Sequence, residues 1–233
     1  MEIIAEIGQN HNGDLNLAKE MIHAAKENGA DVAKFQFFDA KTLFPKENNP
    51  WYEYNLSAEL SKEDMGSLFE LCEKVGIEFM SSAFDRNRVG WLEEMGVQRH
   101  KLASRSIFDK NLSETLQNTE KPLLISLGHW NKKELPNISS SGGVRFLHCI
   151  SEYPTPLDKL RLASLDFSGE VEGFSDHTLG LSASIAALSR GATVIEKHFT
   201  MDKEMYGPDH SCSLNPKELK QLSKFRNDLR MML

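Results

Sequence analysis

The stretch 171–200, VEGFSDHTLGLSASIAALSRGATVIEKHFT, contains the repeating unit of the fold. An apolar run at 171–177 is followed by an amphipathic segment at 179–190, a glycine, and a second apolar run at 192–200. Short apolar, β-branched runs predict buried strands, and a glycine in this place is typical of the end of a helix. Strand, helix and strand in this order predict a βαβ unit with parallel strands.

The same alternation extends through nearly the whole chain. Further strands are predicted at 2–8, 31–37, 78–84, 99–104, 122–128 and 144–150. Helical spacing of apolar residues predicts helices at 14–28, 62–75, 86–95, 157–166 and 216–231. Eight strands, each followed by a helical or loop segment, predict a single compact (β/α)8 TIM barrel over residues 1–233. A doubly wound open sheet is the alternative.

Two connections depart from the regular unit. The segment between the fifth and sixth strands leaves room for only a turn or two, which predicts a shortened fifth helix. The connection 38–60 is too long for an ordinary loop between a strand and its helix. Long loops in compact domains are usually functional or mobile.

Composition excludes several classes of protein. The chain of 233 residues has 27 Lys and Arg against 34 Asp and Glu, a net charge of −7, so nucleic acid and anionic membranes are poor partners. No apolar stretch approaches the roughly 18 residues of a membrane span, and the N-terminus lacks the features of a signal peptide. Three widely spaced cysteines form neither a disulfide framework nor a zinc motif. We therefore expect a cytoplasmic protein.

Ionisable and hydroxyl-bearing residues gather where the predicted strands end. In a barrel, catalytic groups lie at the carboxyl ends of the strands. The residues at these ends are Glu6, Lys34, Gln36, Ser82, Lys101, Ser104, Ser126, Tyr153, Ser175, His177, Glu196 and His198. A purely structural alternative is an ion-pair network of Glu6, Lys34, Lys101 and Glu196 inside the barrel, since buried charges are costly unless paired.

Two histidines indicate a metal site. His177 and His198 end adjacent strands, one βα unit apart, so both imidazoles are expected at one rim. Two neutral nitrogen ligands with open positions suit a labile divalent ion such as Mn²⁺, Mg²⁺, Fe²⁺ or Zn²⁺ that acts as a Lewis acid. Asp209 could add a carboxylate to the metal or the substrate. Its alternative role is an Asx cap in a proline turn.

The remaining polar residues indicate an anion site. Two lysines and several hydroxyls would form a cup rich in cationic donors, which suits phosphate or carboxylate. These residues are Lys34, Lys101, Ser82, Ser104, Ser126 and Ser175. Serines alone are weak evidence, because they often cap the following helix.

Several motifs together resemble the sialic acid synthase family, the N-acetylneuraminate synthases and their relatives. The clearest are IIAEIGQNHNG at 3–13, HCISEYPTP at 148–156, FSDHTLG at 174–180 and VIEKHFTMDKEMYGPDHSCSL at 194–214. The resemblance implies a (β/α)8 barrel that condenses phosphoenolpyruvate with an open-chain amino sugar aldehyde and releases phosphate. It also implies a divalent metal, typically Mn²⁺, with Mg²⁺ or Co²⁺ as alternatives.

The resemblance also assigns residue roles. His177 and His198 match the metal ligands, and Glu6 matches a catalytic glutamate that manages water or proton transfer. The phosphoenolpyruvate contacts match Lys34, Ser82, Lys101, Ser104, Ser126 and Ser175. The sugar contacts match Gln36, Tyr153 and Asp209.

This chain departs from the family pattern on the acceptor side. An acidic residue that holds the N-acetyl sugar is replaced by Ser106, and Arg105 is new at its position. Arg105 suggests an acceptor that carries a carboxylate or phosphate. The chain stops at Leu233, before the family's C-terminal antifreeze-like domain, so we expect that domain's sugar contact to be missing or to come from another polypeptide. A homodimer is expected.

We therefore expect an enzyme that makes a nonulosonic, sialic-acid-like 2-keto-3-deoxy sugar acid. Two alternatives stay open. One is a divalent-metal aldolase or isomerase on the same barrel, and the other is a non-catalytic or partner-dependent barrel.

Overall fold

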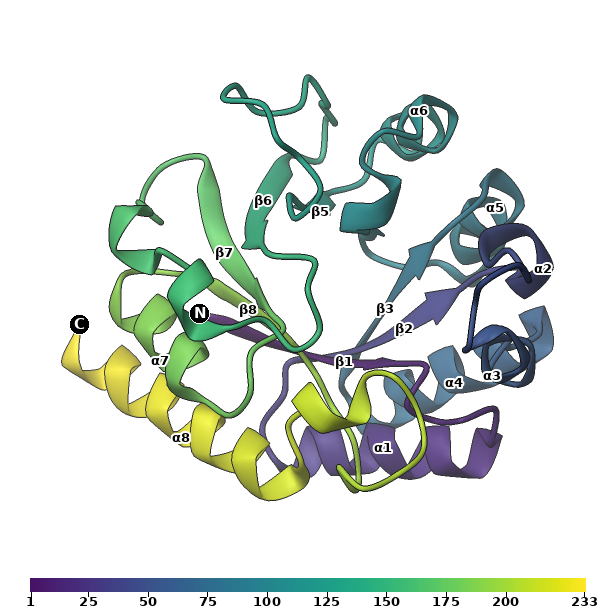
Figure 1. Ribbon diagram of the computed structural model, residues 1–233, viewed down its shortest axis with the longest axis horizontal. Coiled ribbons are helices and arrows are strands. Elements are labelled where there is room, and N and C mark those ends of the chain that lie inside the picture. Colours follow the sequence, from purple (N-terminus) through teal and green to yellow (C-terminus); the bar gives the residue numbers. More distant parts are fainter.

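Eight parallel strands pair in sequence order and close into a barrel in the computed structural model, which describes residues 1–233 (Figure 1). The strands are β1 (Glu2–Gly8), β2 (Val32–Phe37), β3 (Glu78–Ala83), β4 (His100–Leu102), β5 (Leu123–Ser126), β6 (Val144–Cys149), β7 (Val171–Asp176) and β8 (Val194–His198). The first and last strands pair along Glu2–Glu6 and Val194–His198. This closure confirms the predicted TIM barrel and rules out the open sheet.

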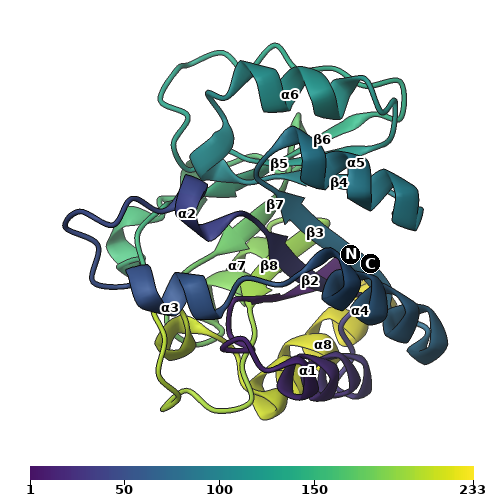
Figure 2. The ribbon, with the colours of Figure 1, turned by 90° about the vertical axis from the view of Figure 1, so that its right-hand side faces the viewer.

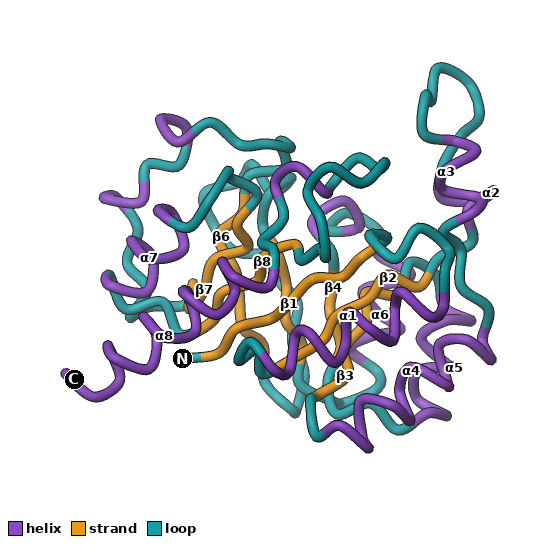
Figure 3. The backbone as a smooth tube through the Cα atoms, turned by 90° about the horizontal axis from the view of Figure 1, so that it is seen from below, coloured by secondary structure: helices purple, strands orange, loops and turns teal.

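Helices surround the barrel on the outside (Figure 3). The main ones are α1 (Leu15–Glu27), α4 (Lys62–Val75), α5 (Arg86–Met95), α6 (Lys110–Gln117), α7 (Ser182–Ser189) and α8 (Pro216–Met232). Side-chain caps fix the starts of all of these except α7, and two of the caps are capping boxes, Ser61 with Asp64 at α4 and Asn215 with Glu218 at α8. The first and last of these helices, α1 and α8, lie side by side (Figures 1 and 2). No helix is long and apolar enough to cross a membrane.

The predicted helix at 157–166 is wrong. Two separate 3₁₀ turns, η2 (Leu157–Lys159) and η3 (Leu162–Ser164), stand there, and Arg161 between them has a φ of 47°. A left-handed residue cannot continue a right-handed helix. The shortened fifth helix is also absent, because no helix lies between β5 and β6. That connection contains Pro136, Gly142 and Gly143, which disfavour helix.

Other helices were not predicted. The eight-residue α6 follows β4, and two short helices, α2 (Ala40–Leu43) and α3 (Tyr52–Ser57), lie within the long connection after β2. Asp39 and Asp109 accept hydrogen bonds from backbone N–H groups in the first turns of α2 and α6. The long connection therefore has structure of its own, and Figure 2 shows α2 and α3 next to each other on one side of the barrel.

An apolar layer fills the barrel interior below the carboxyl ends of the strands. This barrel floor consists of Ile4, Val32, Met80, Leu124, Leu147 and Val194. Two residues further along the same six strands stand Glu6, Lys34, Ser82, Ser126, Cys149 and Glu196. Because strand side chains alternate with period two, residues two apart face the same side, so these six groups also point into the barrel. The alternation thus places a polar layer directly above an apolar one.

Candidate active site

The polar layer encloses a small inner cup of about 60 Å³. Lys34 lies between two carboxylates: its Nζ donates to Oε2 of Glu6 at 2.7 Å and lies 3.5 Å from Oε2 of Glu196. Lys101 donates to the Ser126 hydroxyl at 2.7 Å and lies 3.8 Å from Glu196. All four charged residues are at least 94% buried. The ion-pair network considered from the sequence is therefore present.

The two carboxylates offset the two lysines, so the cup is less cationic than the lysines and serines alone suggested. Burial opposes the charge of Glu196, but Lys101 and Lys34 outweigh it and lower the pKa of this carboxyl to about 2. Burial also opposes the charge of Lys34, but Glu196 and Glu6 raise its pKa overall. For Lys101 burial prevails and lowers the pKa, with only partial compensation by Glu196.

Some buried polar atoms of the cup have no hydrogen-bond partner. They include the Ser82 hydroxyl and Nδ1 of His198. Buried polar groups are nearly always hydrogen-bonded in folded proteins, and exceptions often mark functional sites. A bound ligand would supply the missing hydrogen-bond partners.

The two predicted metal histidines lie side by side at the rim of the cup. The ring centroids of His177 and His198 are 5.7 Å apart, and Tyr153 packs over His177 at 4.0 Å. Nδ1 of His177 lies 2.8 Å from the carbonyl oxygen of Ile150. A proton on Nδ1 would donate to that carbonyl and leave the Nε2 lone pair free. Burial, followed by the neighbouring His198, lowers the pKa of His177 to about 4, which keeps the ring neutral.

This donor set fits a divalent ion. The chain brings no three His, Cys, Asp or Glu side chains together at metal-binding distances. The nearest carboxylate is Asp209, whose Oδ2 lies 4.0 Å from Nδ1 of His198. Two imidazoles, one of them with an unpartnered buried nitrogen, would leave several coordination positions to substrate and water.

The proposed Asx cap at Asp209 is absent. Asp209 precedes the short turn η4 (His210–Cys212), but its carboxylate makes no cap hydrogen bond there. Its backbone carbonyl accepts from the Ser213 hydroxyl at 2.7 Å instead. The carboxylate therefore remains available to the cavity that it lines.

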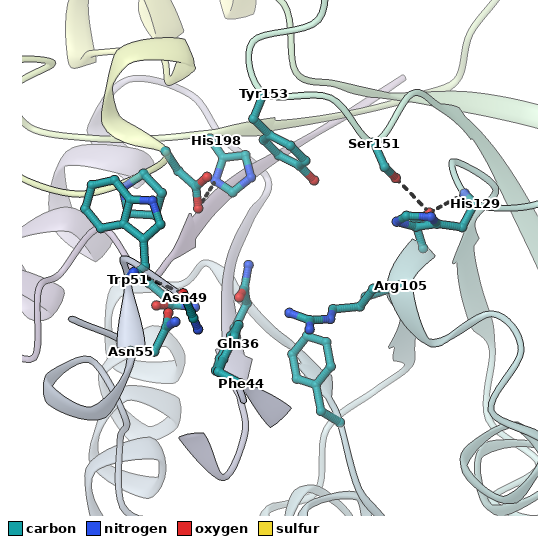
Figure 4. A pocket seen from close by; sticks show the side chains of 16 residues that line it. Gln36, Phe44, Asn49, Trp51, Asn55, Arg105, His129, Ser151, Tyr153 and His198 are labelled. Atoms are coloured by element: carbon teal, nitrogen blue, oxygen red, sulfur yellow. Dashed lines mark hydrogen bonds and ion pairs between the residues drawn. The ribbon is translucent and has the colours of Figure 1, made fainter. Parts of the chain in front are cut away.

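A larger outer cavity of about 570 Å³ opens beside the inner cup. The two share the rim residues Gln36, Ala103, Ser104, Tyr153 and His198. Figure 4 shows Trp51, Asn49 and Asn55 on one side of this outer cavity, with Arg105 and His129 on another. The side chains come from the ends of several strands and from the long connection after β2.

The structure brings together every site residue predicted from the sequence. Those on the inner cup are Glu6, Lys34, Gln36, Ser82, Lys101, Ser104, Ser126, Tyr153, Ser175, His177 and His198. Arg105 and Asp209 line the outer cavity. The individual roles of these residues stay predictions.

Sequence reasoning missed several residues of the site. Cys149 lines the inner cup, and the outer cavity includes Phe44, Asn49, Trp51, Asn55, Phe84, His129 and Pro208. The unusual length of the 38–60 connection marked this region only as functional or mobile. No pattern within that connection showed which of its side chains reach the cavity.

Comparisons with known proteins give a consistent result. The NeuB family model matches residues 21–233. The N,N'-diacetyllegionaminic acid synthase of Legionella pneumophila is 40% identical, over 99% of this chain and 72% of that protein. The human N-acetylneuraminate-9-phosphate synthase is 35% identical, over 94% of this chain and 67% of that protein.

Solved structures agree. A sialic acid synthetase from Leptospira borgpetersenii, crystallised with citrate, superposes with a TM-score of 0.88 at 32% identity, over 99% of this chain and 84% of that chain. A truncated 3-deoxy-D-arabino-heptulosonate 7-phosphate synthase from Thermotoga maritima shares the fold at 18% identity, with a TM-score of 0.74. The chain therefore belongs to the NeuB family and is an enzyme of the sialic acid synthase type.

Proposed function

We propose that the chain condenses phosphoenolpyruvate with an open-chain sugar aldehyde to give a nonulosonic, sialic-acid-like 2-keto-3-deoxy sugar acid and phosphate. One observation carries the proposal: an inner cup of ionic donors shares its rim with a larger polar cavity. Two substrates bound in these two spaces would meet at Gln36, Tyr153 and His198. The relatives named as legionaminic, pseudaminic and neuraminic acid synthases support the same reaction.

The inner cup is the site for phosphoenolpyruvate. Lys101 and the hydroxyls of Ser82 and Ser126 supply donors for phosphate and carboxylate oxygens, whereas the Ser175 hydroxyl donates to Oε1 of Glu196 at 3.0 Å. The Ser82 hydroxyl has no partner within the protein and is free to donate. The burial of this cup strengthens each such contact, because water does not screen it.

The proposed reaction is balanced with one water molecule. C3 of phosphoenolpyruvate forms a bond to the aldehyde carbon, and the aldehyde oxygen takes up a proton to become a hydroxyl. Water adds to C2 and gives up a proton. The bond between C2 and the bridging oxygen then breaks, the C2 hydroxyl gives its proton to the leaving phosphate, and C2 becomes the ketone.

Glu6 is suited to handle a proton in this sequence. Its Oε1 accepts from the Gln36 amide at 2.9 Å, and its Oε2 accepts from Lys34. Both contacts fix the orientation of the carboxyl group. Tyr153, which packs over the two histidines, restricts water at the junction of the two spaces.

His177 and His198 would hold a divalent ion, with Mn²⁺ expected and Mg²⁺ or Co²⁺ as alternatives. Such an ion, when bound, polarises an aldehyde oxygen. Asp209 lies close enough to His198 to orient the acceptor or a water molecule there. We also propose that the chain forms a homodimer. A separate antifreeze-like polypeptide would contribute to the acceptor site.

The test is phosphate release from phosphoenolpyruvate with Mn²⁺ and a panel of amino-sugar and plain-sugar aldehydes. We expect release that requires both acceptor and metal. His177→Ala should lower it at least about a hundredfold, a typical effect of losing a catalytic group. Arg86→Ala, on the outside of α5, is the control and should retain activity.

Other outcomes would contradict the proposal. Turnover of a sugar without phosphate release would favour the aldolase or isomerase alternative. Absence of both phosphoenolpyruvate binding and Mn²⁺ binding, measured by calorimetry, would favour a non-catalytic barrel.

A further inference from the structure

Arg105 places a guanidinium group on the wall of the outer cavity without a carboxylate partner. It lies in the turn η1 (Ser104–Ser106) that follows β4, and it forms no ion pair with any Asp or Glu of the chain. Arg88, Arg99, Arg145 and Arg226 pair with carboxylates, and among the arginines that form no ion pair Arg105 is the one that lines the outer cavity. An unpaired guanidinium beside a cavity is available to bind an anionic group of a ligand.

The surroundings of Arg105 hold its side chain in place and leave most of its donors free. The guanidinium carbon lies 4.8 Å from the ring centre of Phe44 and 6.0 Å from that of Phe84. One terminal nitrogen donates to the carbonyl oxygen of Leu43 over a long distance of 3.4 Å. A guanidinium has five N–H donors, and its planar fork fits phosphate and carboxylate groups.

The outer cavity is electrically asymmetric. Asp209 is the acidic residue of its lining, and it lies beside His198. Figure 4 shows Arg105 across the cavity from His198, with its side chain directed into the space between them. A ligand that spans the cavity would meet a carboxylate and an imidazole at one end and a guanidinium at the other.

We propose that the acceptor carries an anionic group, a phosphate or a carboxylate, which Arg105 binds. The inference rests on the proposed function and specifies the class of its second substrate. The aldehyde end of the acceptor lies toward His198, where the inner cup opens, and its anionic end lies toward Arg105. The polar side chains between these ends, Gln36 and Asn49 among them, contact the sugar hydroxyls.

The first test is kinetic and uses the full chain with Mn²⁺ and phosphoenolpyruvate. Each sugar aldehyde is supplied in neutral form, as its terminal phosphate and as its terminal carboxylate. The expected result is a kcat/KM at least about tenfold higher for one of the anionic forms, which is within the range of one charged contact. Comparison of the phosphate and carboxylate arms identifies the group.

Substitution of Arg105 tests the residue itself. Arg105→Met keeps an apolar stem against Phe44 and should lower the ratio of kcat/KM between anionic and neutral acceptors at least about tenfold. Arg105→Lys keeps the charge without the fork and should give an intermediate ratio. Lys220→Met on the exposed face of α8 removes the same charge elsewhere and should leave the ratio unchanged.

A binding measurement separates this inference from the proposed function. Thermal stabilisation by hexitols and aminohexitols, which lack the aldehyde and cannot react, is compared with that by their terminal phosphates and carboxylates. Excess phosphoenolpyruvate is present to occupy the inner cup. Stabilisation by an anionic form that is lost in Arg105→Met supports the inference even if no turnover is found.

Two results would overturn it. One is phosphate release in which neutral acceptors are used as well as anionic ones, which refutes the role of Arg105 and leaves the proposed function intact. The other is a thermal measurement in which the hexitol phosphates and carboxylates do not stabilise the protein, or stabilise the wild type and Arg105→Met equally.

Discussion

At the scale of single residues, the site concentrates buried groups that would be costly elsewhere. Glu6, Lys34, Lys101 and Glu196 sit within the barrel, although replacing such a network with apolar residues is often neutral or stabilising. The unpartnered Ser82 hydroxyl adds to this cost. Function accounts for an arrangement that stability alone would not select.

His11 makes the stability of the fold depend on pH. Burial lowers its pKa from 6.5 to about 4, so the unfolded chain binds a proton in this range and the folded chain does not. The contribution is complete above pH 6.5, and the free energy of unfolding decreases as the pH falls from 6.5 toward 4. The decrease from this residue would be about 3 kcal/mol.

Urea denaturation at several pH values between 7.5 and 4.5 measures this effect. His11→Asn keeps an acceptor for the backbone N–H of Gly13, which donates to Nδ1 of His11 at 3.1 Å. The variant should lose part of the acid-induced decrease. An identical pH dependence in the two proteins would contradict the assignment.

At the scale of elements, the sequence predicted strands better than helices. Most outward-facing strand residues are apolar and alternate with inward-facing residues at a period of two, and this pattern is visible without tertiary information. The helix predicted at 157–166 has helically spaced leucines, but Arg161 takes a left-handed conformation between two short turns. The spacing of the leucines could not predict the left-handed backbone conformation of Arg161.

The candidate site was predictable for a related reason. Residues such as Lys34, Lys101 and His198 come from strands, and the barrel geometry determines where strand ends meet. Trp51 and Asn55 come from a long connection whose path depends on contacts with distant segments. Trp51, for example, packs against Tyr206 at 5.3 Å, a contact that no local pattern encodes.

The segment after β8 gives a prediction for one element. Gly207 has a φ of 154°, and a Cβ there would lie 2.7 Å from the His210 ring and 2.8 Å from the Tyr54 hydroxyl. Gly207→Ala should displace the segment that carries Asp209. We expect the KM for the sugar acceptor to rise about tenfold, or about 1.4 kcal/mol, with a smaller change for phosphoenolpyruvate.

Steady-state kinetics with each substrate varied in turn measure both constants. Gly90→Ala is the matched control, because no atom lies within 4 Å of its added Cβ and it stands inside α5. That variant should gain up to about 1 kcal/mol in stability without altering either KM. An equal rise of both constants in Gly207→Ala would show that the segment does not act on the acceptor alone.

At the scale of the whole molecule, the two ends of the barrel have separate tasks. The amino ends of the strands carry an ion-pair cluster in which Arg99 contacts Glu2 and Glu78, while Arg145 contacts Glu172 at 2.8 Å and Glu2 at 3.6 Å. These side chains tie together strands that are distant in sequence. The amino ends of the strands therefore contribute to the stability of the fold, whereas the carboxyl ends carry the catalytic groups.

Arg99→Met should therefore destabilise the fold without affecting catalysis. We expect a loss of about 2 kcal/mol, between the values typical of exposed and of buried ion pairs. Urea denaturation measures it, and kcat/KM at 25 °C should remain within about twofold. Lys62→Met, which removes the more exposed pair with Glu94, should cost less than about 1 kcal/mol. A large fall in kcat/KM for Arg99→Met would contradict this division.

The barrel floor also determines the order of events in a reaction cycle. Ile4, Val32, Met80, Leu124, Leu147 and Val194 close the barrel from below, so the inner cup opens on the side of the outer cavity, with which it shares its rim. A sugar that occupied the outer cavity first would block that opening. Under the proposed reaction the smaller anion must therefore enter before the sugar, and an early sugar at high concentration would act as a dead-end inhibitor.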